Sequence, residues 1–185
     1  MANPTPTSQR LLSAAMALIL ERGYNAFSYA DLSVAVGIRK ASIHHHFPTK
    51  AELVATLVKT YRQTARDMIA GGAVPALTPR DKLEAFVGYW TACIAERSQP
   101  ICLAVLLAAE LPSLPDMVAV EVRGHFADLS AWLASVFAEG GEAASDARAE
   151  AFMAAVHGAM LSARAYGDPK VFQLVTAQAL EGLPF

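Results

Sequence analysis

Apolar residues recur through most of the chain at spacings of three and four residues, which is the repeat of an α-helix with one buried face. In residues 8 to 22, for example, Leu11, Ala15, Leu18 and Ile19 share one face. No window of five or more residues alternates β-branched or aromatic residues cleanly with polar ones, so strands are not expected. The pattern predicts an all-α protein.

Residues that start and stop helices divide the apolar segments into nine predicted helices. The first four cover about residues 8–22, 28–37, 39–46 and 49–71, and the others begin near residues 78, 100, 113, 145 and 169. Four starts carry a hydroxyl residue and an acidic residue three positions later, which is the spacing of a capping box: Ser28 with Asp31, Thr49 with Glu52, Thr78 with Asp81, and Ser113 with Asp116. The segment 71–77, GGAVPAL, is the predicted linker.

The predicted helices at 28–37 and 39–46 are short and are joined through a turn, which is the pattern of a helix-turn-helix unit. The apolar residues expected on its inward face are Leu32, Val34, Ile38 and Ile43. The residues left outside on the second helix are Arg39, Lys40, Ala41, Ser42, His44 and His45. Hydrogen-bond donors together with small residues suit a groove of base edges and phosphates, so this helix is predicted to contact DNA.

Charge is unevenly distributed along the 185 residues, whose net charge is -2. Residues 1–50 hold five Lys and Arg against two Asp and Glu, whereas the remaining residues hold ten against fifteen. A basic N-terminal segment on an acidic remainder favours contact between that segment and a polyanion. Two cysteines in a chain that is 54% hydrophobic exclude a disulfide scaffold and a disordered protein.

The sequence also limits location and chemistry. The first ten residues lack the pattern of a secretion signal, and the longest stretch without Asp, Glu, Lys or Arg is 13 residues, too few to cross a bilayer, so a cytoplasmic protein outside the membrane is expected. Motifs that mark common catalytic sites are absent, so no enzyme activity and no cofactor are expected. His44, His45 and His46 diverge by about 100° per residue on a helix, so no metal site is expected there.

The segment SYADLSVAVGIRKASIHHHFPTKAELV resembles the DNA-binding segment of the tetracycline-repressor (TetR) family of transcriptional regulators. The resemblance is close over about residues 8–55 and extends to the rest of the chain only in helix number and order. It implies a three-helix, helix-turn-helix DNA-binding domain in residues 1–48. A helical ligand-binding and dimerisation domain is implied in residues 49–185, with the helix at about 49–71 connecting the two.

The resemblance also implies which residues contact DNA. The residues expected at base edges or nearby phosphates are Arg39, Lys40, Ala41 and Ser42. The residues expected along the phosphate backbone are Ser28, Tyr29, His44, His45 and Lys50. His44 stands where tyrosine is more usual in the family, so DNA binding is expected to become sensitive to pH.

Members of this family hold an inducer cavity among the helices that follow the DNA-binding domain, and the resemblance implies one here. The residues expected to line it are Phe86, Tyr89, Trp90, Cys93, Cys102, His125, Phe126, Trp132 and His157. A cavity of this composition would suit a small apolar or aromatic effector, with His125 or His157 as polar anchors. Ordinary core packing remains the alternative for each aromatic residue.

The combined interpretation is a homodimeric repressor that a small ligand releases from a palindromic operator in double-stranded DNA. Small and apolar residues in the eighth and ninth helices predict that the two chains pair there, with internal packing as the alternative. Two further hypotheses stay open. One is a constitutive DNA-binding or adaptor protein without a ligand, and the other is a thiol-based sensor of oxidants or electrophiles that uses Cys102.

Overall fold

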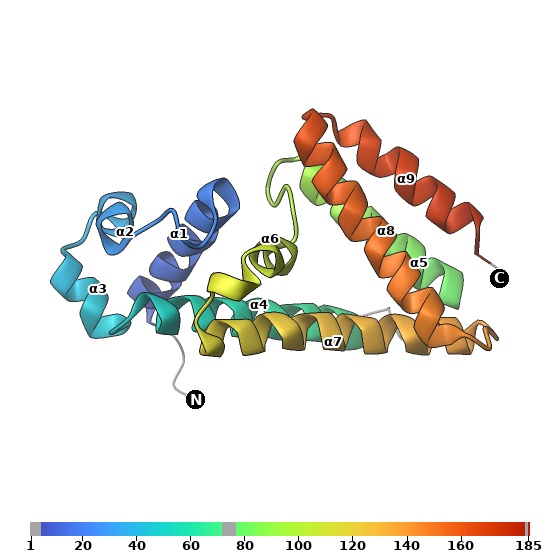
Figure 1. Cartoon of the computed structure of the whole chain (residues 1–185), viewed down its shortest axis with the longest axis horizontal. Coiled ribbons are helices and arrows are strands. Elements are labelled where there is room, and N and C mark those ends of the chain that lie inside the picture. The colour runs from blue at the N-terminus through green and yellow to red at the C-terminus, as the bar shows by residue number, and fades with distance from the viewer. Residues whose placement is uncertain (1–4, 72–76, 184) are drawn as a thin grey trace. The chain divides into compact units, whose positions relative to one another are not determined.

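The computed structural model describes residues 5–71, 77–183 and 185, and every regular element in these ranges is helical (Figure 1). The helices are α1 (Pro6–Arg22), α2 (Tyr29–Val36), α3 (Lys40–His46), α4 (Lys50–Ala70), α5 (Pro79–Ala95), α6 (Leu103–Ala109), α7 (Asp116–Glu139), α8 (Ser145–Tyr166) and α9 (Pro169–Glu181). A short 3₁₀ turn, η2 (Leu111–Ser113), follows α6. The predicted all-α fold with nine α-helices is confirmed over the described residues.

Contacts between residues group the chain into two compact units. The first unit contains the chain up to Thr64 together with Leu103–His125, and the second contains Ala65–Cys102 and Phe126–Phe185. Helices α4 and α7 therefore contribute residues to both units. The domain boundary expected between residues 48 and 49 stays a prediction.

Three of the four predicted capping boxes form. Asp31 accepts from the amide of Ser28 at 2.7 Å, and Ser28 in turn caps the start of α2. The amide of Thr49 donates to Glu52 at 3.0 Å and Thr49 Oγ1 accepts from the amide of Glu52 at 3.1 Å. Thr78 and Asp81 make the same exchange at the start of α5. These pairs satisfy backbone N–H groups that the first turn of a helix leaves without carbonyl partners.

The helix start predicted at Ser113 is wrong in its chemistry. Helix α7 begins at Asp116, and Ser113 instead ends the 3₁₀ turn η2. The hydroxyl of Ser113 donates to the carbonyl of Glu110 at 2.9 Å and accepts from the side-chain amide of Asn25 at 2.8 Å. The tight turn directs the hydroxyl back along the chain, so it does not reach the amides of α7.

In the first unit, α1, α2 and α3 pack around a buried apolar core. Its fully buried members include Leu11, Ile19, Leu32 and Ile43. The inward orientation predicted for Val34 is wrong, because this side chain is 85% exposed. Helix α2 instead buries Leu32 and Val36, which are four residues apart and share a face, whereas Val34 lies about half a turn away from both.

Ion pairs join α4 to α7 in each unit. In the first unit, Arg62 lies 3.3 Å from Glu121, and in the second unit Arg66 lies 2.7 Å from Asp128. The guanidinium of Arg62 passes close over Gly124, where an added Cβ would overlap it. The glycine thus leaves space on α7 for the arginine of α4.

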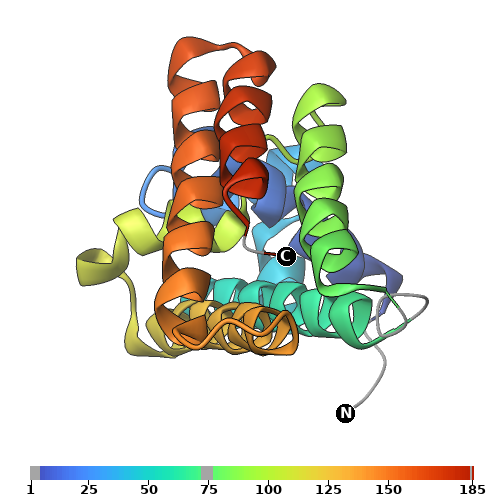
Figure 2. The same cartoon turned by 90° about the vertical axis from the view of Figure 1, so that its right-hand side faces the viewer.

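In the second unit, α8 and α9 run antiparallel and side by side, and α5 packs against α9 (Figures 1 and 2). Lys82 of α5 is buried and its ammonium lies 2.6 Å from Glu139 at the end of α7. Arg80 donates to the carbonyls of Leu180 and Phe185, at 3.3 and 2.8 Å. An arginine at these carbonyls satisfies acceptors at the C-terminal end of α9 and opposes its dipole.

Most of the predicted linker at 71–77 lies outside the described residues, which omit 72–76. Among the described residues, no helix has the length and apolar character needed to cross a membrane.

Candidate nucleic-acid interface

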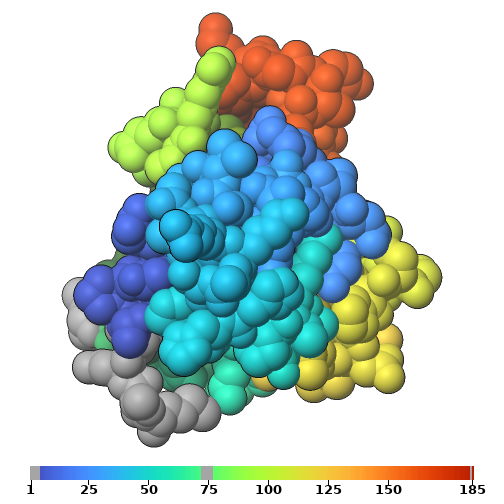
Figure 3. Space-filling model, turned by 90° about the vertical axis from the view of Figure 1, so that its left-hand side faces the viewer, coloured from blue at the N-terminus to red at the C-terminus, as the bar shows by residue number. Residues whose placement is uncertain are grey.

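Helix α3 buries one side and exposes the residues that were predicted to contact DNA. Ile43 is fully buried and Phe47, directly after the helix, is nearly so. The side chains exposed around them are Arg39, Lys40, Ala41, Ser42, His44 and His45. Helices α2 and α3, in blue and cyan, lie uncovered on one face in Figure 3. The arrangement leaves donors and small residues on a protruding helix, as direct reading of base edges requires.

The end of α3 is held by hydrogen bonds to carbonyls. Nδ1 of His44 lies 3.0 Å from the carbonyl oxygen of Pro48, and the hydroxyl of Tyr29 donates to the carbonyl of Phe47 at 2.8 Å. The rings of Tyr29 and His44 are 4.8 Å apart. Because a carbonyl only accepts, Nδ1 of His44 carries a proton and Nε2 is an acceptor whenever the ring is neutral. His44 donates through Nε2 only when it is charged.

Burial, together with the nearby charge of Glu52, raises the pKa of Tyr29 to about 12. The phenol therefore stays protonated at neutral pH and keeps its hydrogen bond to the carbonyl of Phe47. This bond fixes the start of α2 to the segment that leaves α3.

Ser28 is committed to its capping box. Its hydroxyl donates to Asp31 at 2.7 Å and its oxygen accepts from the amide of Ala30 at 3.2 Å. These hydrogen bonds from Ser28 lower the pKa of Asp31 below its usual value. Ser28 and Ala30 at the start of α2 are exposed, and a helix N-terminus favours an anion such as a phosphate.

The ammonium of Lys50 lies inside the first unit. Nζ donates to the carbonyl of Phe27 at 2.5 Å and lies 4.2 Å from the centre of the Phe27 ring and 4.4 Å from that of Tyr24. Partial burial lowers the pKa of Lys50, and the carboxylates of Glu110 and Asp31 oppose that shift. One of its three donors is therefore used within the protein.

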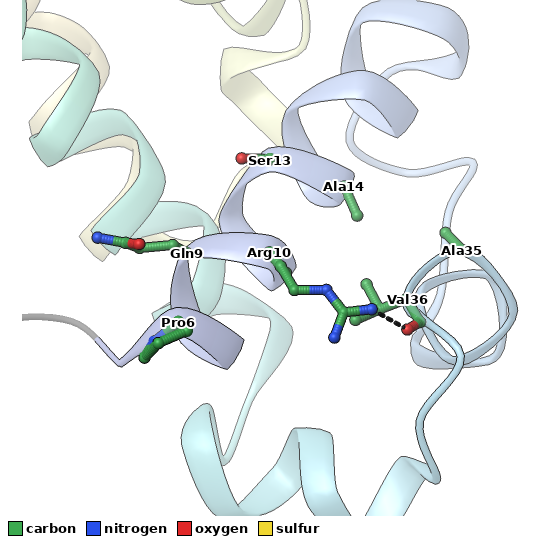
Figure 4. A pocket seen from close by; sticks show the side chains of 7 residues that line it. All are labelled: Pro6, Gln9, Arg10, Ser13, Ala14, Ala35 and Val36. Atoms are coloured by element: carbon green, nitrogen blue, oxygen red, sulfur yellow. Dashed lines mark hydrogen bonds between the residues drawn. The ribbon is translucent and has the colours of Figure 1, made fainter.

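Sequence reasoning missed Arg10. Its guanidinium donates to the carbonyl of Val36 at the end of α2, at 2.7 Å, and ties α1 to the helix-turn-helix unit (Figure 4). A groove of about 460 Å³ surrounds this contact between α1 and α2. The residues that line the groove are Pro6, Gln9, Arg10, Ser13, Ala14, Ala35 and Val36. The excess of basic residues in the first 50 positions was the available signal, but it does not say which arginine is used internally.

The residues predicted to line an effector cavity meet mainly in pairs within the second unit. Ring centres are 5.7 Å apart for Phe86 and Trp132, 5.2 Å for Tyr89 and Trp90, and 5.3 Å for Phe126 and His157. Burial, followed by a hydrogen bond with Cys93, raises the pKa of Tyr89 to about 12.

The remaining two predicted cavity residues are both buried. His125 belongs to the first unit, where its ring is 5.3 Å from that of Tyr61. Cys102 belongs to the second unit and its side chain has no exposed surface. Sensing by this thiol stays a prediction, and its burial argues against direct attack by a dissolved oxidant.

Comparison with known proteins agrees with the helix-turn-helix geometry. The family described as "Bacterial regulatory proteins, tetR family" matches residues 11–57, which contain most of α1, all of α2 and α3, and the start of α4. A crystal structure of a TetR-family transcriptional regulator from Agrobacterium tumefaciens is 48% identical. The alignment covers 98% of this chain and 99% of that one, with a TM-score of 0.93.

Curated relatives match over shorter segments. The HTH-type transcriptional regulator CymR of Pseudomonas putida is 41% identical over 58 residues, which are 31% of this chain and 29% of CymR. The HTH-type transcriptional repressor DhaR of Mycobacterium sp. (strain GP1) is 25% identical over 122 residues, 66% of this chain and 61% of DhaR. The chain thus covers less than two thirds of either curated relative. Its near-complete match to the Agrobacterium regulator and its helix-turn-helix unit show that the chain belongs to the TetR family of DNA-binding transcriptional regulators.

Proposed function

We propose that this TetR-family regulator is a homodimeric repressor that a small apolar or aromatic ligand releases from a palindromic operator. The observation that carries the proposal is the exposed row of donors and small residues on α3, set over the buried Ile43 and Phe47. A helix so arranged enters a major groove, and two copies are needed to contact successive grooves about 34 Å apart.

The proposed DNA contacts fall into two groups. Arg39, Lys40, Ala41 and Ser42 would contact base edges or the phosphates beside them, because they are exposed at the start of α3. The residues proposed to contact the phosphate backbone are Ser28, Tyr29, His44, His45 and Lys50. Phosphate contacts set orientation and base contacts set sequence preference, so the two groups have different effects when they are mutated.

The exposed face of α8 and α9 supports the proposed dimer. Leu161 on α8 is 47% exposed and Leu174 on α9 is 70% exposed. One turn and two turns before Leu161, the exposed positions are the small residues Gly158 and Ala154. Small residues let a helix of a second chain approach closely, and the large apolar side chains then pack against that helix. Burial of Leu161 and Leu174 in such a contact removes exposed apolar surface from water, which favours the dimer. The interface proposed is α8 and α9 of each protomer.

The ligand and the repressor role rest on two supports. The aromatic pairs of the second unit supply apolar surface of the kind that small ligands contact. DhaR, one of the curated relatives, is a transcriptional repressor. The proposed mechanism is a shift between two conformations, in which the ligand prefers the one whose DNA-binding units no longer fit the operator.

The test begins with selection of random duplex DNA by the purified chain, followed by titration of the enriched duplex over a range of salt concentrations. A palindromic consensus with a salt-dependent affinity supports the dimeric regulator. Candidate apolar and aromatic compounds are then screened for a rise in melting temperature, and those that raise it are tested for release of the duplex. Binding without sequence preference would reject the operator, and an absence of any stabilising compound would favour the constitutive or adaptor alternative.

A further inference from the structure

The carboxylate of Glu110 is bound by the loop that joins α1 to α2. Glu110 directly follows α6, and its Oε1 accepts from the backbone amide of Tyr24 at 2.8 Å. Its Oε2 accepts from the backbone amide of Asn25 at 3.2 Å and from the side-chain amide of Asn25 at 2.9 Å. All of these residues belong to the first unit. Three donors from the loop therefore converge on one carboxylate that comes from a distant part of the sequence.

The loop is shaped to receive this carboxylate. Gly23 has a φ of 85°, a conformation that other residues rarely adopt. A Cβ at this position would lie 2.5 Å from Glu110 Oε1, closer than non-bonded atoms approach. The missing side chain thus permits both the turn and the approach of Glu110.

The same loop leads to the proposed phosphate contacts. After Asn25, the chain reaches Phe27, whose carbonyl accepts from the ammonium of Lys50 and whose ring lies beneath it. The ring of Tyr24 lies under the same ammonium. Ser28, the next residue, caps the start of α2. The loop is consequently held by Glu110 at one end and holds Lys50 and the start of α2 at the other.

We infer that Glu110 is a positioning residue for DNA binding: it fixes the α1–α2 loop and thereby places Lys50 and the N-terminus of α2 against the phosphate backbone. The inference rests on the proposed phosphate contacts of Ser28, Tyr29 and Lys50. Because Glu110 directly follows α6, a displacement of α6 would act on the DNA-binding unit through this carboxylate.

For a neutral replacement of Glu110, a pure charge effect and a positioning role predict opposite changes in DNA affinity. A carboxylate repels a polyanion, so replacing Glu110 with a neutral residue would strengthen DNA binding if its charge were all that mattered. If the carboxylate positions the loop, the same change weakens binding. The sign of the effect therefore separates the two roles.

The experiment compares Glu110→Gln with Glu21→Gln in the full chain, using the palindromic duplex enriched by selection. Both substitutions remove one negative charge from the first unit, but Glu21 is exposed and pairs with Arg22 rather than with the loop. We expect Glu110→Gln to weaken binding about tenfold, as the loss of charge-assisted hydrogen bonds implies, and Glu21→Gln to leave it unchanged or slightly stronger. Binding is measured at a temperature where circular dichroism shows all variants folded.

Two further readouts test the contacts of the loop and of Lys50 directly. Displacement of Lys50 from a phosphate lowers the slope of log affinity against log salt concentration by about 0.9 for each lysine. Glu110→Gln keeps one acceptor oxygen and replaces the other with an NH2 group, which cannot accept from an amide. Hydrogen exchange therefore becomes faster at whichever of the Tyr24 and Asn25 amides faces that NH2 group.

The experiment distinguishes a failure of the role of Glu110 from a failure of the proposed phosphate contacts. If Lys50→Ala and Ser28→Ala weaken binding but Glu110→Gln behaves like Glu21→Gln with an unchanged salt slope, the inference about Glu110 is overturned and the contacts stand. If Lys50→Ala and Ser28→Ala have no effect on binding, the proposed contacts fail, and the positioning role fails with them. Weaker binding, a lower slope and faster exchange together support it.

Discussion

Several side chains proposed to contact DNA also donate hydrogen bonds within the protein, and these bonds limit what the same side chains can donate to DNA. Tyr29, His44 and Lys50 each donate to a backbone carbonyl near the turn between α3 and α4 or the start of α2. Lys50 has two further N–H bonds, whereas the single hydroxyl proton of Tyr29 is already used and leaves only an acceptor, which a phosphate oxygen does not bind.

Gly37→Ala is expected to lower the free energy of unfolding by about 1 kcal/mol. Gly37 ends α2 with φ 71° and ψ 34°, a left-handed conformation that costs a residue with a Cβ about that amount. The matched control is Gly88→Ala, in the interior of α5, which is expected to stabilise by up to about 1 kcal/mol. A Cβ at either position meets nothing within 4 Å, so only the backbone conformation differs. Urea unfolding at one protein concentration measures the free energy of unfolding of both variants. A change of the same sign in Gly37→Ala and Gly88→Ala would contradict this explanation.

At the scale of elements, charged side chains tie helices together at a few points. Arg62 and Arg66 join α4 to α7, and Lys82 joins α5 to the end of α7. Lys82 differs from the two arginines because its side chain is only 9% exposed. A buried ammonium needs its carboxylate more than an exposed guanidinium does, since water no longer compensates for the loss of the partner.

Glu139→Gln is therefore expected to destabilise the chain by about 1 to 2 kcal/mol, a value below that of fully buried pairs because Glu139 is half exposed. Lys82→Met removes the buried charge itself and keeps the apolar stem, so its cost is expected to be smaller. Chemical unfolding of the two variants beside wild type gives the comparison. A larger loss of unfolding free energy for Lys82→Met than for Glu139→Gln would show that groups other than Glu139 stabilise the buried ammonium.

For the whole molecule, dimerisation determines whether the α3 helices of two chains can bind one duplex together. Typical TetR regulators dimerise, and the proposed interface here is the exposed face of α8 and α9. The chain offers a matched pair of sites to test it, because Leu161 on α8 and Met117 on α7 are both 47% exposed.

We expect Leu161→Glu to convert the dimer to a monomer and to reduce affinity for the palindromic duplex at least about tenfold. A charge in an apolar helix contact leaves a desolvated carboxylate without a partner, and a monomer loses one of the two half-sites. Met117→Glu adds the same charge outside α8 and α9 and should leave the oligomeric state unchanged. Light scattering coupled to size exclusion measures the mass of each variant, and a dimeric Leu161→Glu would move the interface away from this part of α8.

Local sequence patterns specify the helical class, the positions of the helices and the helix-turn-helix unit. These follow from local chemistry: the three- and four-residue apolar repeat, and caps such as Ser28 with Asp31 whose partners are three residues apart. The two local errors have different causes: the helical repeat itself places Val34 half a turn from Leu32 and Val36, whereas Ser113 is bound by Asn25, which lies far away in the sequence. Val36 replaced Val34 in the core, and Asn25 and Glu110 bound Ser113.

Polar contacts between residues far apart in the sequence depend on how the helices pack. Glu110 and the loop after α1, Arg10 and the end of α2, and Arg80 and the end of α9 are pairs separated by many residues, and a capped or amphipathic helix looks the same with or without them. The tautomer of His44 and the internal contact of Lys50 also depend on carbonyls that the fold brings near. The sequence specifies secondary structure through interactions within a few residues, whereas these long-range contacts exist only after packing has fixed the distances.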